Sequence, residues 1–126
     1  SDAPPLPVKL EVCSGVGDWV VAQAKAEEGC ANWVACELRY DRISTIFTKM
    51  VLSQVSNLAV LAGDATGICQ MQVPAISLEL ICINFPEPPQ TFRNSSCEDV
   101  NDSALHLLTT DFFRAAAGLL TASGLL

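Results

Sequence analysis

Histidine is nearly absent from this sequence of 126 residues, in which His106 is the single example. Catalysis by a serine or cysteine nucleophile needs a base within hydrogen-bond reach, and histidine is the usual base. We interpret His106 as a residue at the edge of a packed helix face rather than as a general base. The scarcity of histidine therefore predicts that the protein is not an enzyme.

Basic residues are also scarce, with seven lysines and arginines against fourteen acids and a net charge of −7. Neutralising the phosphates of a nucleic acid requires a basic stripe on the protein surface. The lysines and arginines of this chain are instead scattered along its length. The composition predicts that nucleic acid is not a partner.

Long uncharged runs are missing as well, and none reaches the roughly 18 residues that a membrane-spanning helix needs. The uncharged tail 115–126 follows the small residues 101–103 and a spacer, which is the pattern of a lipid-anchor signal. We keep a C-terminal lipid anchor as the minor alternative to a freely secreted protein.

Cysteine, in contrast, is abundant and even in number, which in a short chain is typical of disulfide bonds and an oxidising compartment. Successive cysteines are separated by at least five residues, so the paired Cys-x-x-Cys spacing of a zinc site is absent. No metal and no cofactor is expected. The predicted disulfide-bonded residues, whose pairing the sequence leaves open, are Cys13, Cys30, Cys36, Cys69, Cys82 and Cys97.

Two further features favour an extracellular protein. Asn94 and Asn101 each begin an Asn-x-Ser tripeptide, the acceptor pattern for N-glycosylation. The chain also starts without a charged and apolar leader, as a mature protein does after its signal peptide has been removed. We predict a secreted glycoprotein with one disulfide-stabilised domain over 1–126, in which 1–7 form an extended arm.

The first half of the chain contains one strand pattern and two helix patterns. Apolar and charged residues alternate over 8–12, as in a half-buried strand, and a turn over 14–17 precedes Asp18, a good N-cap. Helical spacing then continues to about residue 40, either as one helix or as two shorter helices that meet near Gly29. The clearest apolar stripe predicts a helix over 43–61.

The second half is less regular. Apolar and polar residues alternate on both sides of Pro74 over 68–85, which favours two strands, although an apolar run of this length also fits a buried helix. A Pro-rich loop follows, and the stripe over 105–120 predicts a final helix. The expected fold is α+β and helix-dominated, with a short antiparallel hairpin over 68–85; an all-α fold is the alternative.

Two patterns with chemical potential receive a structural interpretation. Gly15-Val16-Gly17 resembles the start of a phosphate-binding loop, but position 20 is valine and no βαβ unit with a downstream acid is evident. We interpret it as a turn. Glu37 and Asp41 are four residues apart and are interpreted as a solvated acidic face that nearby arginines neutralise.

The preferred function is non-enzymatic recognition of a protein or a cell surface through a face that disulfides hold rigid, as in an effector, toxin or inhibitor. The alternative is an extracellular carrier of a lipid-like or sterol-like ligand in a cavity between helices. A secreted hydrolase is the weakest hypothesis. The residues expected to line the carrier's cavity are Ile46, Met50, Leu58, Leu108 and Phe112.

Overall fold

Strands and helices alternate along the chain in the computed structural model, which describes residues 3–84 and 108–126. The first part contains β1 (Val8–Val12), α1 (Asp18–Ala26), β2 (Asn32–Glu37), α2 (Tyr40–Leu52), β3 (Leu58–Ala62), α3 (Ala65–Met71) and β4 (Leu78–Ile83). The second part contains α4 (Thr110–Leu119) and β5 (Leu120–Leu125).

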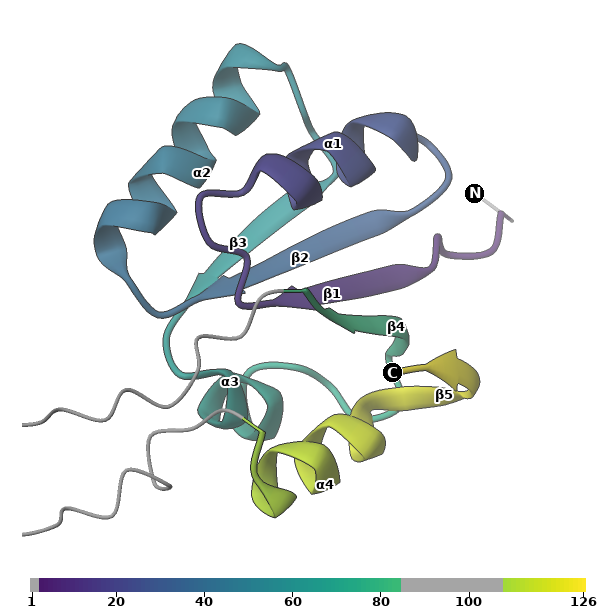
Figure 1. Cartoon of the computed structure of the whole chain (residues 1–126). Coiled ribbons are helices and arrows are strands. Elements are labelled where there is room, and N and C mark those ends of the chain that lie inside the picture. Colours follow the sequence, from purple (N-terminus) through teal and green to yellow (C-terminus); the bar gives the residue numbers. More distant parts are fainter. Residues whose placement is uncertain (1–2, 85–107) are drawn as a thin grey trace, which may run out of the picture.

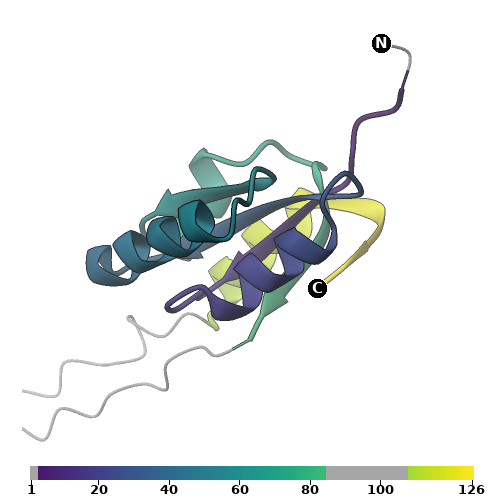
Figure 2. The same cartoon turned by 90° about the horizontal axis from the view of Figure 1, so that it is seen from above.

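The five strands form one sheet in the order β3-β2-β1-β4-β5, and each neighbouring pair is parallel. Helices α1 and α2 cover one face of the sheet, and α3 and α4 cover the other (Figure 1). The view from above shows α1 and α2 over the strands, with α4 beneath them (Figure 2). Such a doubly covered parallel sheet is a Rossmann-like α/β fold.

The face under α1 and α2 is closed by an apolar cluster between these two helices and the sheet. Val20 and Ala24 of α1 and Ile46 of α2 are fully buried against Trp33 and Ala35 of β2. The ring of Trp19 also meets that of Trp33 edge to face, with 5.5 Å between their centroids. This packing fixes both helices on the sheet.

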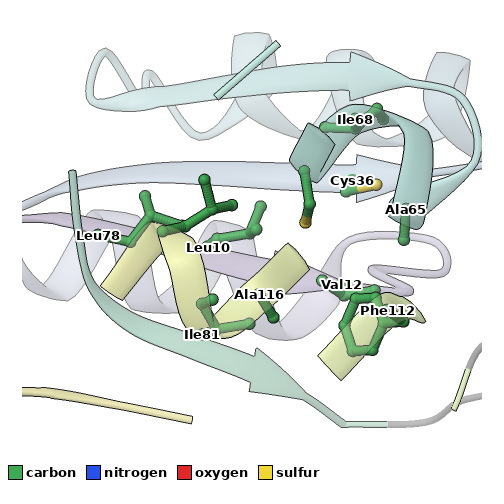
Figure 3. Close-up of a cluster of buried hydrophobic side chains, with 11 residues drawn as sticks. Leu10, Val12, Cys36, Ala65, Ile68, Leu78, Ile81, Phe112 and Ala116 are labelled. Atoms are coloured by element: carbon green, nitrogen blue, oxygen red, sulfur yellow. The ribbon is translucent and has the colours of Figure 1, made fainter. Parts of the chain in front are cut away.

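A second apolar cluster fills the opposite face, between the sheet and α3 and α4 (Figure 3). Leu10 and Val12 point to this face, because alternate residues of a strand point to opposite sides. Phe112 and Ala116 of α4 are fully buried against them. The strand β1 is therefore buried on both faces, which makes it the centre of the fold.

The predicted fold class is wrong, and so is the all-α alternative. The strand over Val8–Val12 is confirmed, but the expected antiparallel hairpin over 68–85 is instead the end of α3, a turn and the parallel strand β4. The alternation before Pro74 lies partly in α3, whereas the alternation after it belongs to a true strand. A local pattern does not show which strand lies beside β4 or in which direction that strand runs.

Two of the predicted helices are too long. The helix that begins at Asp18 ends at Ala26, and the residues after Gly29 form β2 instead of more helix. The helix over 43–61 is confirmed only as far as Leu52, after which the chain turns and enters β3. Leu58 and Leu61 match the helical spacing by coincidence, because every residue of β3 is apolar and such a run fits any spacing.

The predicted disulfide-stabilised domain is wrong as well. Five of the six cysteines fall within the described residues, and none of the five takes part in a disulfide bond. Cys36 in β2 and Cys69 in α3 are buried in the apolar cluster, where cysteine acts as a small apolar side chain. Cys97 lies outside the described residues, as do both predicted glycosylation sites and His106.

The C-terminal tail has a structural role. Its residues 120–125 form β5, which pairs with β4, and 115–119 belong to α4. Within 3–84 and 108–126, no helix is long and apolar enough to cross a membrane.

Candidate functional site

The carboxyl ends of β1 and β4 meet at a point where the chain reverses its direction across the sheet. From β1 the chain moves outward to β2 and β3, and it then crosses back to place β4 on the other side of β1. Ligands of open α/β sheets bind in the crevice that such a reversal leaves at the carboxyl ends of the strands. The residues at this edge therefore define the candidate site.

The loop from β1 to α1 forms the base of the site and contains three residues with left-handed backbone. The φ angles are 60° at Cys13, 59° at Gly15 and 85° at Gly17. A Cβ on Gly15 would meet no atom within 4 Å, so space lies open beside this backbone. A Cβ on Gly17 would lie 2.7 Å from Cγ1 of Ile46, so glycine is needed for α2 to pack against the loop.

Glu37, the last residue of β2, closes one side of this loop. Its Oε2 accepts a hydrogen bond of 2.8 Å from the backbone N–H of Gly15, and its Oε1 accepts one of 3.3 Å from the N–H of Arg39. The residue is only 5% exposed. A carboxylate has about four acceptor positions, so Glu37 retains acceptor capacity toward a ligand.

Glu11 lies on β1 directly before the loop and is 1% exposed. The amide of Asn84 donates a hydrogen bond of 2.6 Å to its Oε2, whereas its Oε1 is buried without any hydrogen-bond partner. Burial raises the pKa of this carboxyl. A buried acceptor without a partner is costly to a fold, and a ligand that donates to Oε1 would remove that cost.

A pocket of about 370 Å³ lies over the loop. Among the described residues that line it, Arg42 is the one cation, and it approaches Glu37 with 3.6 Å between Nη1 and Oε1. The lining residues are Glu11, Cys13, Ser14, Gly15, Val16, Gly17, Asp18, Trp19 and Arg42. The pocket therefore combines open space beside the backbone of Gly15 with the buried carboxylate of Glu11, whose Oε1 can still accept a hydrogen bond.

Two further polar residues follow the carboxyl ends of β3 and β4 at the same edge of the sheet. Asp64 follows β3 and caps α3 by accepting a hydrogen bond of 3.0 Å from the N–H of Gly67. Asn84 follows β4 and reaches Glu11. Among the described residues, no group of His, Cys, Asp and Glu side chains could hold a metal ion. The site fits an organic ligand that carries hydroxyl and cationic donors.

Gly15-Val16-Gly17 forms a turn as predicted, in which the N–H of Gly17 donates a hydrogen bond of 3.0 Å to the carbonyl of Ser14, but the statement that no βαβ unit is evident is wrong. The elements β1, α1 and β2 form a βαβ unit with parallel strands, and Glu37 is the downstream acid, 20 residues after Gly17. This spacing matches the acid that contacts ribose in dinucleotide-binding folds. The signal was present in the sequence, but an apolar strand that ends in glutamate was taken for helix.

The two acids of the predicted acidic face, Glu37 and Asp41, differ in their exposure to solvent. Asp41 is exposed and forms a paired hydrogen bond with Arg39, with 3.1 and 2.9 Å between their atoms. Glu37 is buried in the site, so a solvated face over both acids is wrong for it. The prediction that arginines neutralise the two acids is confirmed by both ion pairs.

The structure does not bring the expected cavity-lining residues together. Ile46 and Leu58 are buried in the cluster under α1 and α2, and Met50 packs against it. Phe112 belongs to the cluster on the opposite face of the sheet, and Leu108 is 39% exposed. The sheet separates the two groups.

Comparison with known proteins gives a direct family match. A family model described as "Putative methyltransferase" matches residues 5–96. A protein of Chlamydia abortus named tRNA (guanine-N(7)-)-methyltransferase is 37% identical over 117 residues, which cover 83% of this chain and 52% of that protein. A protein of Chlamydia trachomatis with the same name is 41% identical over 88 residues, covering 70% and 39%. The chain spans about half the length of such relatives.

Solved structures agree on the fold. TrmN from Thermus thermophilus superposes with a TM-score of 0.68 at 22% identity, over 94% of this chain and 31% of that one. A methyltransferase from Thiobacillus denitrificans, solved with S-adenosyl-L-homocysteine, gives a TM-score of 0.63 at 14% identity, over 94% and 40%. At such identities the likeness concerns the fold alone.

These findings overturn five predictions. A secreted binding protein, a lipid carrier and a hydrolase are all wrong, and so is the expectation that the protein is not an enzyme, because the matched family is one of methyltransferases. The exclusion of nucleic acid is contradicted by relatives whose name places their activity on tRNA. The extracellular location stays a prediction. By the match over residues 5–96, the chain belongs to this methyltransferase family.

Proposed function

We propose that the protein transfers the methyl group of S-adenosylmethionine to N7 of a guanine in tRNA. The observation that carries the proposal is the site at the end of β1, where a glycine loop with open backbone lies between Glu11 and Glu37. The tRNA and the guanine N7 come from the names of the curated relatives. The cofactor comes from the fit of the site.

The residues of the site fit the polar groups of S-adenosylmethionine. Glu37 offers acceptor positions for the ribose hydroxyls, as the corresponding acid of dinucleotide-binding folds does. The buried Oε1 of Glu11 offers an acceptor for a cationic or hydroxyl donor of the ligand. The open space beside Gly15 lets a ligand approach the backbone closely. When bound, S-adenosylmethionine supplies a methyl group on a positively charged sulfur.

The chemistry explains why an enzyme of this kind can lack a catalytic histidine. N7 of guanine is unprotonated at neutral pH and attacks through its own lone pair, so no base has to remove a proton. The N–C bond forms as the C–S bond breaks, and the positive charge moves from sulfur to the purine ring. The protein's task is to bind and orient the two partners in line.

The test is methyl transfer from S-adenosylmethionine with a labelled methyl group to tRNA transcripts. We expect label in ordinary transcripts and none in transcripts made with 7-deazaguanosine, which lack the N7 atom. Glu37→Gln should lower the rate at limiting cofactor by about tenfold, because it removes a charged acceptor. Arg114→Met, which alters an exposed ion pair on α4, is the matched control.

Two results would contradict the proposal. Absence of label in every transcript would exclude tRNA as the substrate. Equal labelling of ordinary and 7-deazaguanosine transcripts would show that the methyl group goes to a different atom.

A further inference from the structure

We propose that Arg42 is a positioning residue, which holds the Glu37 carboxylate in the orientation that the nucleoside part of the cofactor requires. The inference rests on the proposed function, and it assigns to α2 a role in a site that β1, α1 and β2 otherwise form. Arg42 acts through Glu37 and is not itself a catalytic residue.

The first observation is the set of contacts around Glu37. Two backbone N–H groups hold its two oxygens, from Gly15 at 2.8 Å and from Arg39 at 3.3 Å. The guanidinium of Arg42 lies 3.6 Å from Oε1, and within 3–84 and 108–126 it is the one side-chain cation in an ion pair with Glu37. At 5% exposure, Glu37 receives little stabilisation from water, so the charge of Arg42 acts on it with little screening.

The second observation is how firmly α2 fixes the position of Arg42. Ile46, one turn further along α2, is fully buried against the backbone of Gly17. Lys49, about two turns along, forms an ion pair with Asp18 at the start of α1. Residues 42, 46 and 49 share one face of the helix by their spacing. Their contacts therefore hold α2 against the end of β2, the β1–α1 loop and the start of α1.

The physical consequence concerns the direction of the carboxylate. Without Arg42, the described donors to this carboxylate are two backbone N–H groups, and a buried charge loses an opposite charge. A carboxylate that rotates loosens its hydrogen bond to the N–H of Gly15. The loop and the acceptor for the ribose would then be disturbed together.

The experiment measures binding of two probes by calorimetry to the purified protein. S-adenosylhomocysteine carries both a nucleoside and an amino-acid part, whereas 5′-methylthioadenosine carries only the nucleoside. For Arg42→Met we expect the Kd of both probes to rise by about tenfold, because a partner of a buried charge is lost. Arg42→Lys should recover most of the affinity. Arg114→Met, which breaks an ion pair of the same 3.6 Å length on α4, should bind like wild type.

A second readout needs no ligand and tests the mechanism directly. The backbone amide of Gly15 reports its hydrogen bond to Glu37, so Arg42→Met should shift its NMR resonance and speed its hydrogen exchange. Arg42→Lys should leave both near their wild-type values. Amide resonances of α4 should be unchanged in both variants, which shows that the fold is intact.

The outcomes separate this inference from the proposed function. If wild type binds neither probe, both the cofactor assignment and the role of Arg42 are wrong. If wild type binds and Arg42→Met binds equally well, only the inference fails. A loss confined to S-adenosylhomocysteine would also overturn it, because Arg42 would then contact the amino-acid part directly.

Discussion

Burial of the Glu11 carboxyl costs free energy that its described contacts only partly offset. Burial raises its pKa, hydrogen bonds to Ser14 and Asn84 lower it in part, and the charge of Glu37 raises it again. The carboxyl therefore ionises more readily in the unfolded chain, where its pKa is about 4.5. Stability must fall as pH rises from that value through the raised pKa of the folded state.

Glu11→Gln should remove this pH dependence, since the amide does not titrate. We expect the free energy of unfolding of the variant to gain on that of wild type as the pH rises from about 4 to neutrality. Urea denaturation across this pH range measures the difference. The same variant should bind S-adenosylhomocysteine less tightly, since it loses a negative charge in the pocket. A wild type that gains stability relative to the variant with rising pH would contradict the burial argument.

The kinds of residue in the sequence were not enough to predict this site. Cysteine suggested disulfides, but Cys36 and Cys69 are buried as apolar side chains, and burial raises the pKa of both thiols. Cys13 has a left-handed φ in the loop of the site, a conformation that glycine adopts more easily. A search for glycines therefore recognises only part of this loop.

At the scale of elements, the contact between α2 and the β1–α1 loop determines the shape of the site. Gly15 and Gly17 both have left-handed φ, but only Gly17 lies against a neighbouring element. A substitution of Gly15 therefore tests backbone strain alone, whereas a substitution of Gly17 tests backbone strain and packing together. A comparison of their alanine variants tests the contact with α2.

Gly15→Ala should lower the free energy of unfolding by about 1 kcal/mol, the cost of a left-handed backbone. Gly17→Ala should cost about 1 to 3 kcal/mol more, because its new Cβ would overlap Ile46. Adding Ile46→Ala, which removes both Cγ atoms that the new Cβ would meet, to Gly17→Ala should cost less than Ile46→Ala costs alone. Thermal and urea denaturation measure all four variants. Equal losses for the two alanine variants would contradict close packing of α2 on the loop.

The elements that the sequence predicts best are those with a local signal. The alternation of Val8–Val12 and the stripe at the start of α2 are local, and both elements are confirmed. Strand β3 was merged with the preceding helix, and β2 with α1, because the apolar residues of these two strands follow one another without polar residues between them. The order of the strands depends on contacts between distant residues, which local patterns do not contain.

At the scale of the whole molecule, the acidic composition and the proposed tRNA substrate have to be reconciled. Each lysine and arginine within the described ranges lies within 4 Å of a carboxylate, as in the pairs Lys9–Glu27, Lys25–Glu28 and Lys49–Asp18. The prediction that these cations are dispersed is therefore correct. The conclusion drawn from it, that nucleic acid is not a partner, was wrong. Net charge bears on how strongly a chain binds phosphates, whereas the reaction depends on the site.

The central claim is that the β1–α1 loop binds the methyl donor, and an NMR titration with S-adenosylhomocysteine tests it most directly. We predict saturable binding, with the largest changes at the amides of Gly15 and Gly17 and at the end of β2, and small changes in β5. Absence of binding, or changes confined to residues away from the carboxyl ends of β1 and β2, would contradict the account.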